Sequence, residues 1–345
     1  MLQCQCVAVG DCNGLALKAG ATVMPCYSPL TAYRCKGGIF FDKNRALNYG
    51  IPEMLQLPCG QCIGCRLERS RQWMIRCEKE LQLHDNSCFL TLTYDPKHLP
   101  PHGFLRHEDY QKFAKRLRMW ISREVQKEAI RRGEINAPLR SVPIRYFMCG
   151  EYGSNGDRPH YHAIIFGFDP PDKVRFKSNG QGHDLYVSDI LRSLWPYGHH
   201  LIGAVTPQSI GYVARYSLKK VNGRDKDYHY KTDIVDPATG ELLQRPPEYA
   251  RMSLRPAIAR EWYDLYKSDM RNDSVVSQGR ESRVPAYFDK LTRRYEGEEK
   301  YNAIKKERMA RALQSADDNT PERLAIREEV RRARIKSLKR SYEED

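Results

Sequence analysis

The sequence lacks any apolar run long enough to cross a membrane. Its first segment, residues 1–23, has neither a basic start nor a long apolar core, so it does not predict a signal peptide. No internal repeat is detectable. Acidic residues are outnumbered: 43 Asp and Glu face 57 Lys and Arg, for a formal net charge of +14. We therefore expect a basic, non-membrane protein that acts in a cytosol.

The chain combines basic groups with many aromatic rings. Its 345 residues are enough to bury a full core and to form two domains. Aromatic residues make up 10% of the chain and include 21 tyrosines. Lys and Arg neutralise phosphates, and rings stack on bases. The composition favours a nucleic-acid-binding protein, although a basic structural protein would share the charge.

Cysteine is present in an odd number, 11. Without a secretion signal, these residues are expected to be reduced thiols or metal ligands. Cys59, Cys62 and Cys65 have a C-x2-C-x2-C spacing that is typical of metal sites, with Cys26 or Cys35 as the fourth ligand. The continuation typical of an iron–sulfur run is missing. The prediction is a Zn²⁺ site; the alternative is a set of reduced thiols beside a basic helix.

Hydrophobic periodicity predicts an α+β protein with a central antiparallel sheet flanked by helices. The carboxyl-terminal part is dominated by Glu, Lys and Arg and predicts a tail of solvated helices. Thr206 and Ser188 are expected to cap helices. The expected strands are 88–94, 143–151, 159–168 and 201–205, and the expected helices are 66–83, 106–132, 188–195, 206–221 and 255–268.

Two histidines stand one residue apart at the start of a β-rich run, at His160 and His162. Residues two apart in a strand share a face. Asn155-Gly156 predicts a tight hairpin turn, and that turn would place Glu151 directly opposite His160. A His-His-carboxylate set with open positions suits Mg²⁺ or Mn²⁺ that also holds a phosphate. The alternative is a half-buried strand with two hydrogen-bonded histidines.

The segment 206–221 predicts a helix with two tyrosines four residues apart. Tyr212, Tyr216 and Lys219 are expected to cluster on the face opposite the apolar stripe. A lysine beside a phenol favours the phenolate and can hold a phosphate. Two nucleophiles a few Å apart on one helix suit two successive transesterifications.

Three motifs in this order resemble the HUH endonucleases of rolling-circle replication, which are named for two histidines around a bulky residue. They are 89–94, FLTLTY; 158–162, RPHYH; and 212–219, YVARYSLK. The two-tyrosine form is similar to the gene A replication proteins of isometric single-stranded DNA phages. Further segments look like the replication initiators of the gokushovirus branch of the microviruses, and the resemblance covers roughly 24–292: MPCYSPLTAYR, LPCGQCIGCRLERSRQW, MSLRPAIAREWYDLYKSD and RVPAYFDKL.

The resemblance implies an HUH fold and a metal-dependent nicking and joining activity. A tyrosine would attack the origin DNA, giving a 5′-phosphotyrosine and a free 3′-OH that primes a polymerase. The second tyrosine would cut the regenerated origin, and rejoining would close a circle. Tyr216 is expected to act first, with Lys219 as its partner. The implied partners are single-stranded or supercoiled viral origin DNA and the host replication machinery, helicase and polymerase, in the host cytoplasm.

Two other functions stay open at this point. One is a non-catalytic, zinc-containing DNA-binding protein; the other is a metal-dependent phosphodiesterase that uses water as the nucleophile. The predicted organisation has five parts: an extension at 1–23, disordered or arising from an upstream start; a Cys-rich basic segment at 24–83; an HUH nicking-joining domain at 84–225; an accessory region at 226–292; and a charged helical tail at 293–345.

Overall fold

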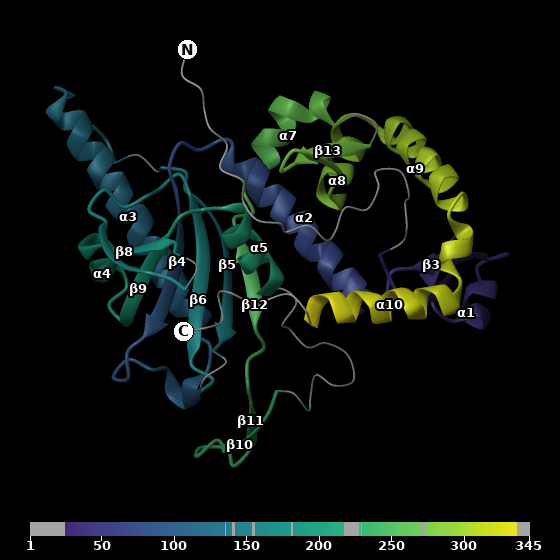
Figure 1. Cartoon of the computed structure of the whole chain (residues 1–345), viewed down its shortest axis with the longest axis horizontal. Helices are drawn as coiled ribbons and strands as arrows, with labels where there is room; N and C mark the ends of the chain where they lie inside the picture. Colours follow the sequence, from purple (N-terminus) through teal and green to yellow (C-terminus); the bar gives the residue numbers. More distant parts are fainter. Residues whose placement is uncertain are drawn as a thin grey trace.

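An antiparallel sheet of seven strands forms the centre of the molecule (Figure 1). The computed structural model describes residues 25–134, 136–139, 142–153, 156–180, 182–216, 228, 230–270 and 273–336. The sheet order is β12-β5-β6-β4-β9-β8-β7, and each neighbouring pair is antiparallel. The strand bounds are β4 Ser87–Tyr94, β5 Arg145–Tyr152, β6 Pro159–Phe166, β7 Val174–Ser178, β8 Asp184–Val187, β9 Gly198–Gly203 and β12 Tyr249–Met252.

The prediction of a mixed fold with a large antiparallel sheet is confirmed. The sequence did not predict β7, β8 or β12, and β12 enters the sheet from a segment about 100 residues after its neighbour β5. The strand expected at 201–205 begins and ends earlier, at Gly198–Gly203. The division of the chain into domains stays a prediction.

The hairpin of β5 and β6 has the predicted register. Glu151 pairs with His160, and Tyr152 pairs with Pro159. Residue 155 lies outside the described residues, but Gly156 has a φ of 75°, a left-handed value that suits a tight turn. The hairpin therefore sets the site residues at one end of adjacent strands.

Helices cover both faces of the sheet. On one face, α3 (His107–Arg131) and α4 (Asp189–Leu194) pack on Leu90, Leu92 and Tyr161. On the other face, α2 (Ile63–Leu81), α5 (Pro207–Tyr216), α7 (Arg260–Tyr266) and α8 (Ala286–Tyr295) pack on a second apolar cluster that includes Phe89 and Ile164. Because strand side chains alternate, Tyr161 points away from the face that carries its neighbours His160 and His162.

Two predicted helix caps are present. Ser188 accepts a hydrogen bond from the Leu191 N–H at the start of α4. Thr206 Oγ1 accepts one from the Ser209 N–H, 3.1 Å away, at the start of α5. Both hydroxyls satisfy an N–H that lacks a partner inside the helix. The helix expected at 255–268 is shorter, Arg260–Tyr266, and a 3₁₀ turn, η2 (Lys267–Asp269), follows it.

Smaller units surround this centre. The sequence analysis assigned none of the short strands, and a further 3₁₀ turn, η1, spans Pro101–Gly103. The amino-terminal part forms a three-stranded sheet of order β2-β1-β3 with a short helix, and two hairpins lie in the carboxyl-terminal half. Their bounds are β1 Leu30–Cys35, β2 Gly38–Phe40, α1 Lys43–Leu47, β3 Glu53–Leu57, β10 Lys231–Val235, β11 Leu242–Gln244, β13 Ser274–Ser277 and β14 Arg280–Arg283.

The charged tail forms the predicted helices, α9 (Glu298–Leu313) and α10 (Pro321–Lys336), with a 3₁₀ turn, η3 (Ala316–Asn319), between them. They curve around α8 and reach back toward β3 and α1 (Figure 1). Within the described ranges, none of the helices is both long and apolar enough to span a membrane.

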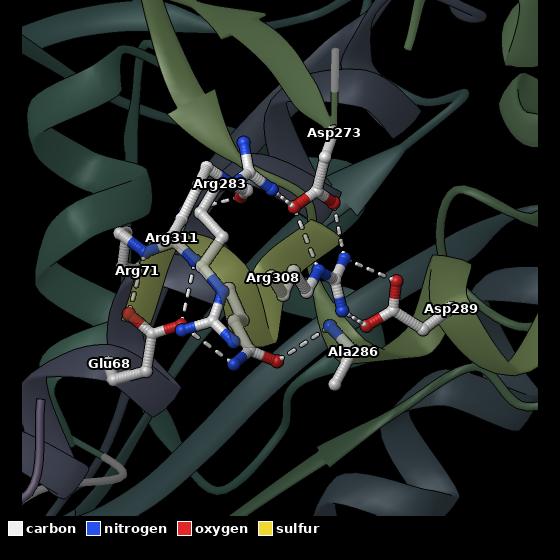
Figure 2. Close-up of polar contacts among 9 residues, drawn as sticks. Glu68, Arg71, Asp273, Arg283, Ala286, Asp289, Arg308 and Arg311 are labelled. Carbon is white, nitrogen blue, oxygen red and sulfur yellow. Dashed lines mark hydrogen bonds and ion pairs between the residues drawn. The ribbon is translucent and has the colours of Figure 1, made fainter. Parts of the chain in front are cut away.

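An ion-pair network holds α9 against the β13–β14 hairpin and α8 (Figure 2). Arg308 bonds the carboxylates of Asp273 and Asp289, and the distance to Asp289 is 2.8 Å. Arg311 Nη2 lies 2.6 Å from Asp273 Oδ2. Burial alone lowers the pKa of Arg308, but the two carboxylates outweigh it and raise the pKa above its ordinary value. Because Asp273 is almost fully buried, this network is the main polar attachment of α9.

Candidate metal centre and tyrosine helix

The side chains of Glu151, His160 and His162 converge on one face of the sheet. Both imidazole Nε2 atoms face the same carboxylate oxygen of Glu151, at 3.3 Å from His160 and 2.9 Å from His162. The side chain of Glu151 is 1% exposed, while those of the two histidines are 17% and 8% exposed. The three predicted metal ligands are therefore brought together in a site that is open only on its histidine side.

The outer nitrogens of both rings have their own partners. His160 Nδ1 lies 3.1 Å from the Arg158 carbonyl oxygen, and His162 Nδ1 lies 3.0 Å from Thr91 Oγ1. A carbonyl only accepts, so the Nδ1 of His160 carries the proton and its Nε2 presents a lone pair. A lone pair facing a carboxylate oxygen is repulsive unless a cation lies between them. The donor set thus fits a divalent cation, and its nitrogen and oxygen chemistry suits Mg²⁺ or Mn²⁺.

The charge of Glu151 is maintained in spite of its burial. Burial raises the pKa of this carboxyl, but hydrogen bonds and charge interactions with His160 and His162 outweigh it and lower the pKa to about 2. The group is thus ionised throughout the physiological range. An ionised, buried carboxylate beside two imidazoles is a suitable ligand for a hard cation.

Tyr212 lies directly against this site. Its hydroxyl is 3.4 Å from His162 Nε2, and the two rings meet edge to face with centroids 5.0 Å apart. The ring also packs edge-on against Phe89, with centroids 6.2 Å apart. A phenolic oxygen next to a metal ligand is placed to react with a phosphate held there.

The prediction that Tyr212 lies on a polar face, away from the apolar stripe, is wrong. Tyr212 is only 8% exposed and belongs to the same apolar cluster as Ile210 and Val213. Helix α5 is enclosed between α2 and strands β5 and β6, so both its faces are covered. Helical periodicity identified the face of Tyr212 correctly but could not show that the sheet covers it.

The other residues of the predicted tyrosine site lie outside the described side chains. Helix α5 ends at Tyr216, whose side chain is not described, and Lys219 is beyond the end of the described segment. Their roles stay predictions.

A second group of ligands lies at the start of α2. Cys26, Cys59, Cys62 and Cys65 place their sulfurs within 4.8 Å of one another. Four sulfurs around Zn²⁺ at about 2.3 Å form a tetrahedron with edges of about 3.8 Å, and Cys26 Sγ and Cys62 Sγ are 3.9 Å apart. The structure thus selects Cys26 over Cys35 as the fourth ligand, because Cys35 contacts the Gly38 carbonyl instead.

Backbone N–H groups point at these sulfurs. Tyr27 N lies 3.3 Å from Cys62 Sγ, Cys59 N lies 3.3 Å from Cys26 Sγ, and Cys62 N lies 3.2 Å from Cys59 Sγ. Burial raises the pKa of Cys62, but hydrogen bonds, first from the Cys65 N–H and then from the Tyr27 N–H, lower it to about 7. Such donors stabilise thiolates, which are the metal-binding form.

Gly64 allows the two halves of the cysteine cluster to meet. A Cβ atom at Gly64 would lie 1.7 Å from the Pro25 carbonyl oxygen. Only glycine permits this approach, which brings Cys26 next to the first turn of α2. The segment C-I-G-C therefore carries two ligands and the space for the chain that supplies a third.

Sequence reasoning missed the residues that orient the histidines. Thr91 lies opposite His162 in the β4–β6 pair, and the Arg158 carbonyl precedes His160 by two residues. The alternation in FLTLTY does indicate that Thr91 and Thr93 share a face. It does not indicate that β4 lies beside β6.

The comparisons with known proteins agree on one family. Its sequence model, that of the replication-associated protein ORF2 family, matches residues 87–221. "Replication-associated protein VP4" of Bdellovibrio phage phiMH2K is 32% identical over 271 residues, 77% of this chain and 76% of the relative. "Replication-associated protein ORF2" of Spiroplasma virus 4 is 29% identical over 309 residues, 83% of this chain and 86% of the relative. "Replication-associated protein ORF4" of Chlamydia phage 1 is 27% identical over 264 residues, 72% of this chain and 58% of the relative. No solved structure matches the chain.

Proposed function

The chain belongs to the family of replication-associated proteins of gokushovirus-like phages, and from this we propose that it initiates rolling-circle replication by nicking and rejoining origin DNA. The observation that carries the proposal is the contact between Tyr212 and the Glu151-His160-His162 set, where the phenolic oxygen lies 3.4 Å from a metal-ligating nitrogen. The seven-stranded antiparallel sheet that carries the histidine pair supports an HUH fold for this domain.

The proposed metal site holds Mg²⁺ or Mn²⁺ between Glu151 Oε1 and the Nε2 atoms of His160 and His162. When bound, the ion supplies positive charge that polarises the scissile phosphate. The protein contributes one buried carboxylate and two neutral imidazoles, which leaves a net positive charge at the site for the anionic phosphate. The open histidine side is the direction from which DNA would approach.

In the proposed chemistry a tyrosine oxygen forms a bond to phosphorus while the bond from phosphorus to the 3′ oxygen breaks. The phenol loses its proton, and the departing 3′ oxygen gains one. The product is a 5′-phosphotyrosine and a free 3′-OH. In the reverse transfer a 3′-OH attacks the phosphotyrosine and closes a circle without ATP, because the energy of the phosphodiester is kept in the covalent link.

We propose that Tyr212 and Tyr216 perform the two transfers. Support for Tyr212 comes from its position beside His162. Tyr216 lies one turn further along the same helix, so it is a neighbour of Tyr212 on the helix surface. The sequence prediction that Tyr216 acts first, assisted by Lys219, is retained as part of this proposal.

A structural Zn²⁺ is proposed for the cysteine cluster. Four thiolates around Zn²⁺ carry a net charge of −2, and arginines gather beside the cluster. Arg69 bonds the Gly60 carbonyl between two of the ligands, and Arg331 bonds the Tyr27 hydroxyl next to a third. Arg66 directly follows Cys65 and has a buried Nε without a partner among the described residues. Cation charge on three sides supports an anionic, metal-loaded cluster.

The proposed partners are single-stranded or supercoiled viral origin DNA and the helicase and polymerase of the host, and the proposed place of action is the interior of the host cell. The basic balance of the chain suits DNA, because Lys and Arg release counterions from phosphates. Family membership implies a role in phage replication but does not identify the host.

One assay tests the function directly. The full chain is incubated with single-stranded DNA and Mn²⁺, and the products are separated on a denaturing gel. We expect a covalent protein–DNA adduct that disappears with EDTA. Cleavage without an adduct would support the water-using phosphodiesterase, and DNA binding without cleavage would support the non-catalytic zinc protein.

A further inference from the structure

The two metal-ligating histidines are oriented by different kinds of partner. His160 Nδ1 faces the Arg158 carbonyl at 3.1 Å, which is a backbone group that no side-chain substitution removes. His162 Nδ1 faces the hydroxyl of Thr91 at 3.0 Å, which a single substitution removes. We propose that Thr91 is a positioning residue for the metal centre: its hydroxyl accepts the Nδ1–H of His162 and thereby holds Nε2 as the lone pair that ligates the cation.

The register of the sheet places Thr91 for this role. Strand β4 pairs with β6 so that Thr91 lies directly opposite His162. Leu90 and Leu92 point to the other face, into the apolar cluster under α3. The position of Thr91 is therefore set by pairing and core packing on both sides, so the hydroxyl is held near the ring without a flexible backbone.

His162 needs such a partner more than His160 does. Its Nε2 lies 2.9 Å from the Glu151 carboxylate, the shorter of the two distances. A carboxylate is a strong acceptor and favours the tautomer with the proton on Nε2, in which the ring cannot ligate a metal. A hydroxyl at Nδ1 can accept a proton there, or donate to a bare nitrogen. Thr91 therefore stabilises the ligating tautomer without preventing the ring from changing tautomer when the metal leaves.

Thr93 offers a matched control on the same strand and the same face. It lies opposite His160, but its hydroxyl lies 3.4 Å from the His199 carbonyl oxygen. His160 is already oriented by the Arg158 carbonyl. The two threonines thus have equal positions relative to the two histidines and differ in whether the hydroxyl contacts the ring.

The inference rests on the proposed metal-dependent function, but its test does not need DNA. Mn²⁺ alone is titrated into the full chain, and free Mn²⁺ is followed by electron paramagnetic resonance. Thr91→Val keeps the shape and removes the hydroxyl, and it should weaken Mn²⁺ binding by about 10- to 100-fold, the usual effect of losing an outer partner of a ligand. Thr91→Ser should bind within about threefold of the unsubstituted chain, since the acceptor is retained. Thr93→Val should bind Mn²⁺ unchanged.

A second measurement uses the unsubstituted chain and so does not depend on the folding of a variant. With ¹⁵N-labelled histidine and Mg²⁺ bound, the nitrogen shifts of His162 should show the proton on Nδ1. A proton on Nε2 would overturn the inference, as would normal Mn²⁺ affinity in Thr91→Val or an equal loss in Thr93→Val. Should the unsubstituted chain form no DNA adduct while Thr91→Val still loses Mn²⁺, the nicking proposal fails and the role of Thr91 stands.

Discussion

Glu151 and His162 approach within 2.9 Å although they are not paired in the sheet. Glu151 lies opposite His160, two residues from His162, yet its carboxylate is closer to His162 than to His160. The diagonal approach is within reach of long side chains on one sheet face. It places one oxygen between two imidazole nitrogens, which is the geometry expected of a shared cation.

Removal of this carboxylate should abolish metal-dependent cleavage. Glu151→Ala leaves two neutral imidazoles, which hold Mg²⁺ poorly because that ion prefers oxygen ligands. Mn²⁺ accepts imidazole more readily, so excess Mn²⁺ should restore part of the nicking. Normal cleavage with Mg²⁺ in the variant would place the third ligand elsewhere. The measurement is the nicking rate on a labelled oligonucleotide across both metal titrations.

Loss of either histidine should separate cleavage from DNA binding. Loss of an outer partner alone lowers activity of metal sites by roughly 10- to 100-fold, so His160→Ala and His162→Ala should each lower the nicking rate by about 100-fold or more. DNA affinity should change little, because phosphate contacts by Lys and Arg carry it. Gel-shift and nicking assays on the same preparations check both parts. A double histidine variant that nicks at the normal rate would exclude this metal site.

Replacement of the tyrosines by phenylalanine tests the nucleophiles with little effect on packing. Tyr212→Phe keeps the ring against Phe89 and His162 and removes only the hydroxyl. We expect each single variant to retain DNA binding and to fail in release of a circle, and the double Tyr212→Phe, Tyr216→Phe variant to form no adduct. We expect Tyr216→Phe to lower the first cleavage more, given Lys219. Cleavage by the double variant would point to water as the nucleophile.

A methyl group at Gly64 should disrupt the cysteine cluster. Its Cβ would lie 1.7 Å from the Pro25 carbonyl oxygen, so the segment that carries Cys26 must move away. Elemental analysis should find about one Zn²⁺ per chain in the unsubstituted protein and much less in Gly64→Ala. Gly180→Ala is the control, because nothing lies within 4 Å of its Cβ position. Equal zinc content in both variants would argue against Cys26 as a ligand.

The network around Asp273 should anchor the carboxyl-terminal helices. Asp273→Asn removes a buried charge that bonds Arg308 and Arg311 and leaves both guanidinium groups without it (Figure 2). Breaking a buried pair costs about 3 kcal/mol, so the amides of α9 should exchange with deuterium much faster. The exposed pair of Arg323 and Asp318 is the control, and Asp318→Asn should change stability by less than about 1 kcal/mol. Unchanged exchange in Asp273→Asn would show that apolar contacts hold α9.

The hairpin and its ligands could be predicted because they depend on local rules. A two-residue turn and the alternation of a strand together determine which residues face one another, and Glu151, His160 and His162 follow from these two facts. The caps at Ser188 and Thr206 are local in the same sense, since each hydroxyl bonds an N–H three residues later. The C-x2-C-x2-C spacing likewise indicated three of the four cysteines.

Contacts between distant segments were not predictable in this way. Strand β12 joins the sheet beside β5, and the fourth cysteine, Cys26, comes from a segment that passes Gly64. Sequence spacing left Cys26 and Cys35 equal as candidates. The decision belongs to the path of the backbone, which periodicity does not describe.

By itself, the sequence determined the chemistry of this protein: a carboxylate and two imidazoles on one strand pair, a tyrosine helix, and a cysteine run. Only the tertiary structure decided that Tyr212 is buried against His162 and that Thr91 reaches the other side of the same ring. The physical reason is that both contacts depend on which elements are neighbours. Helix α5 lies between α2 and the sheet, and β4 lies beside β6, because apolar surfaces far apart in the chain are buried together.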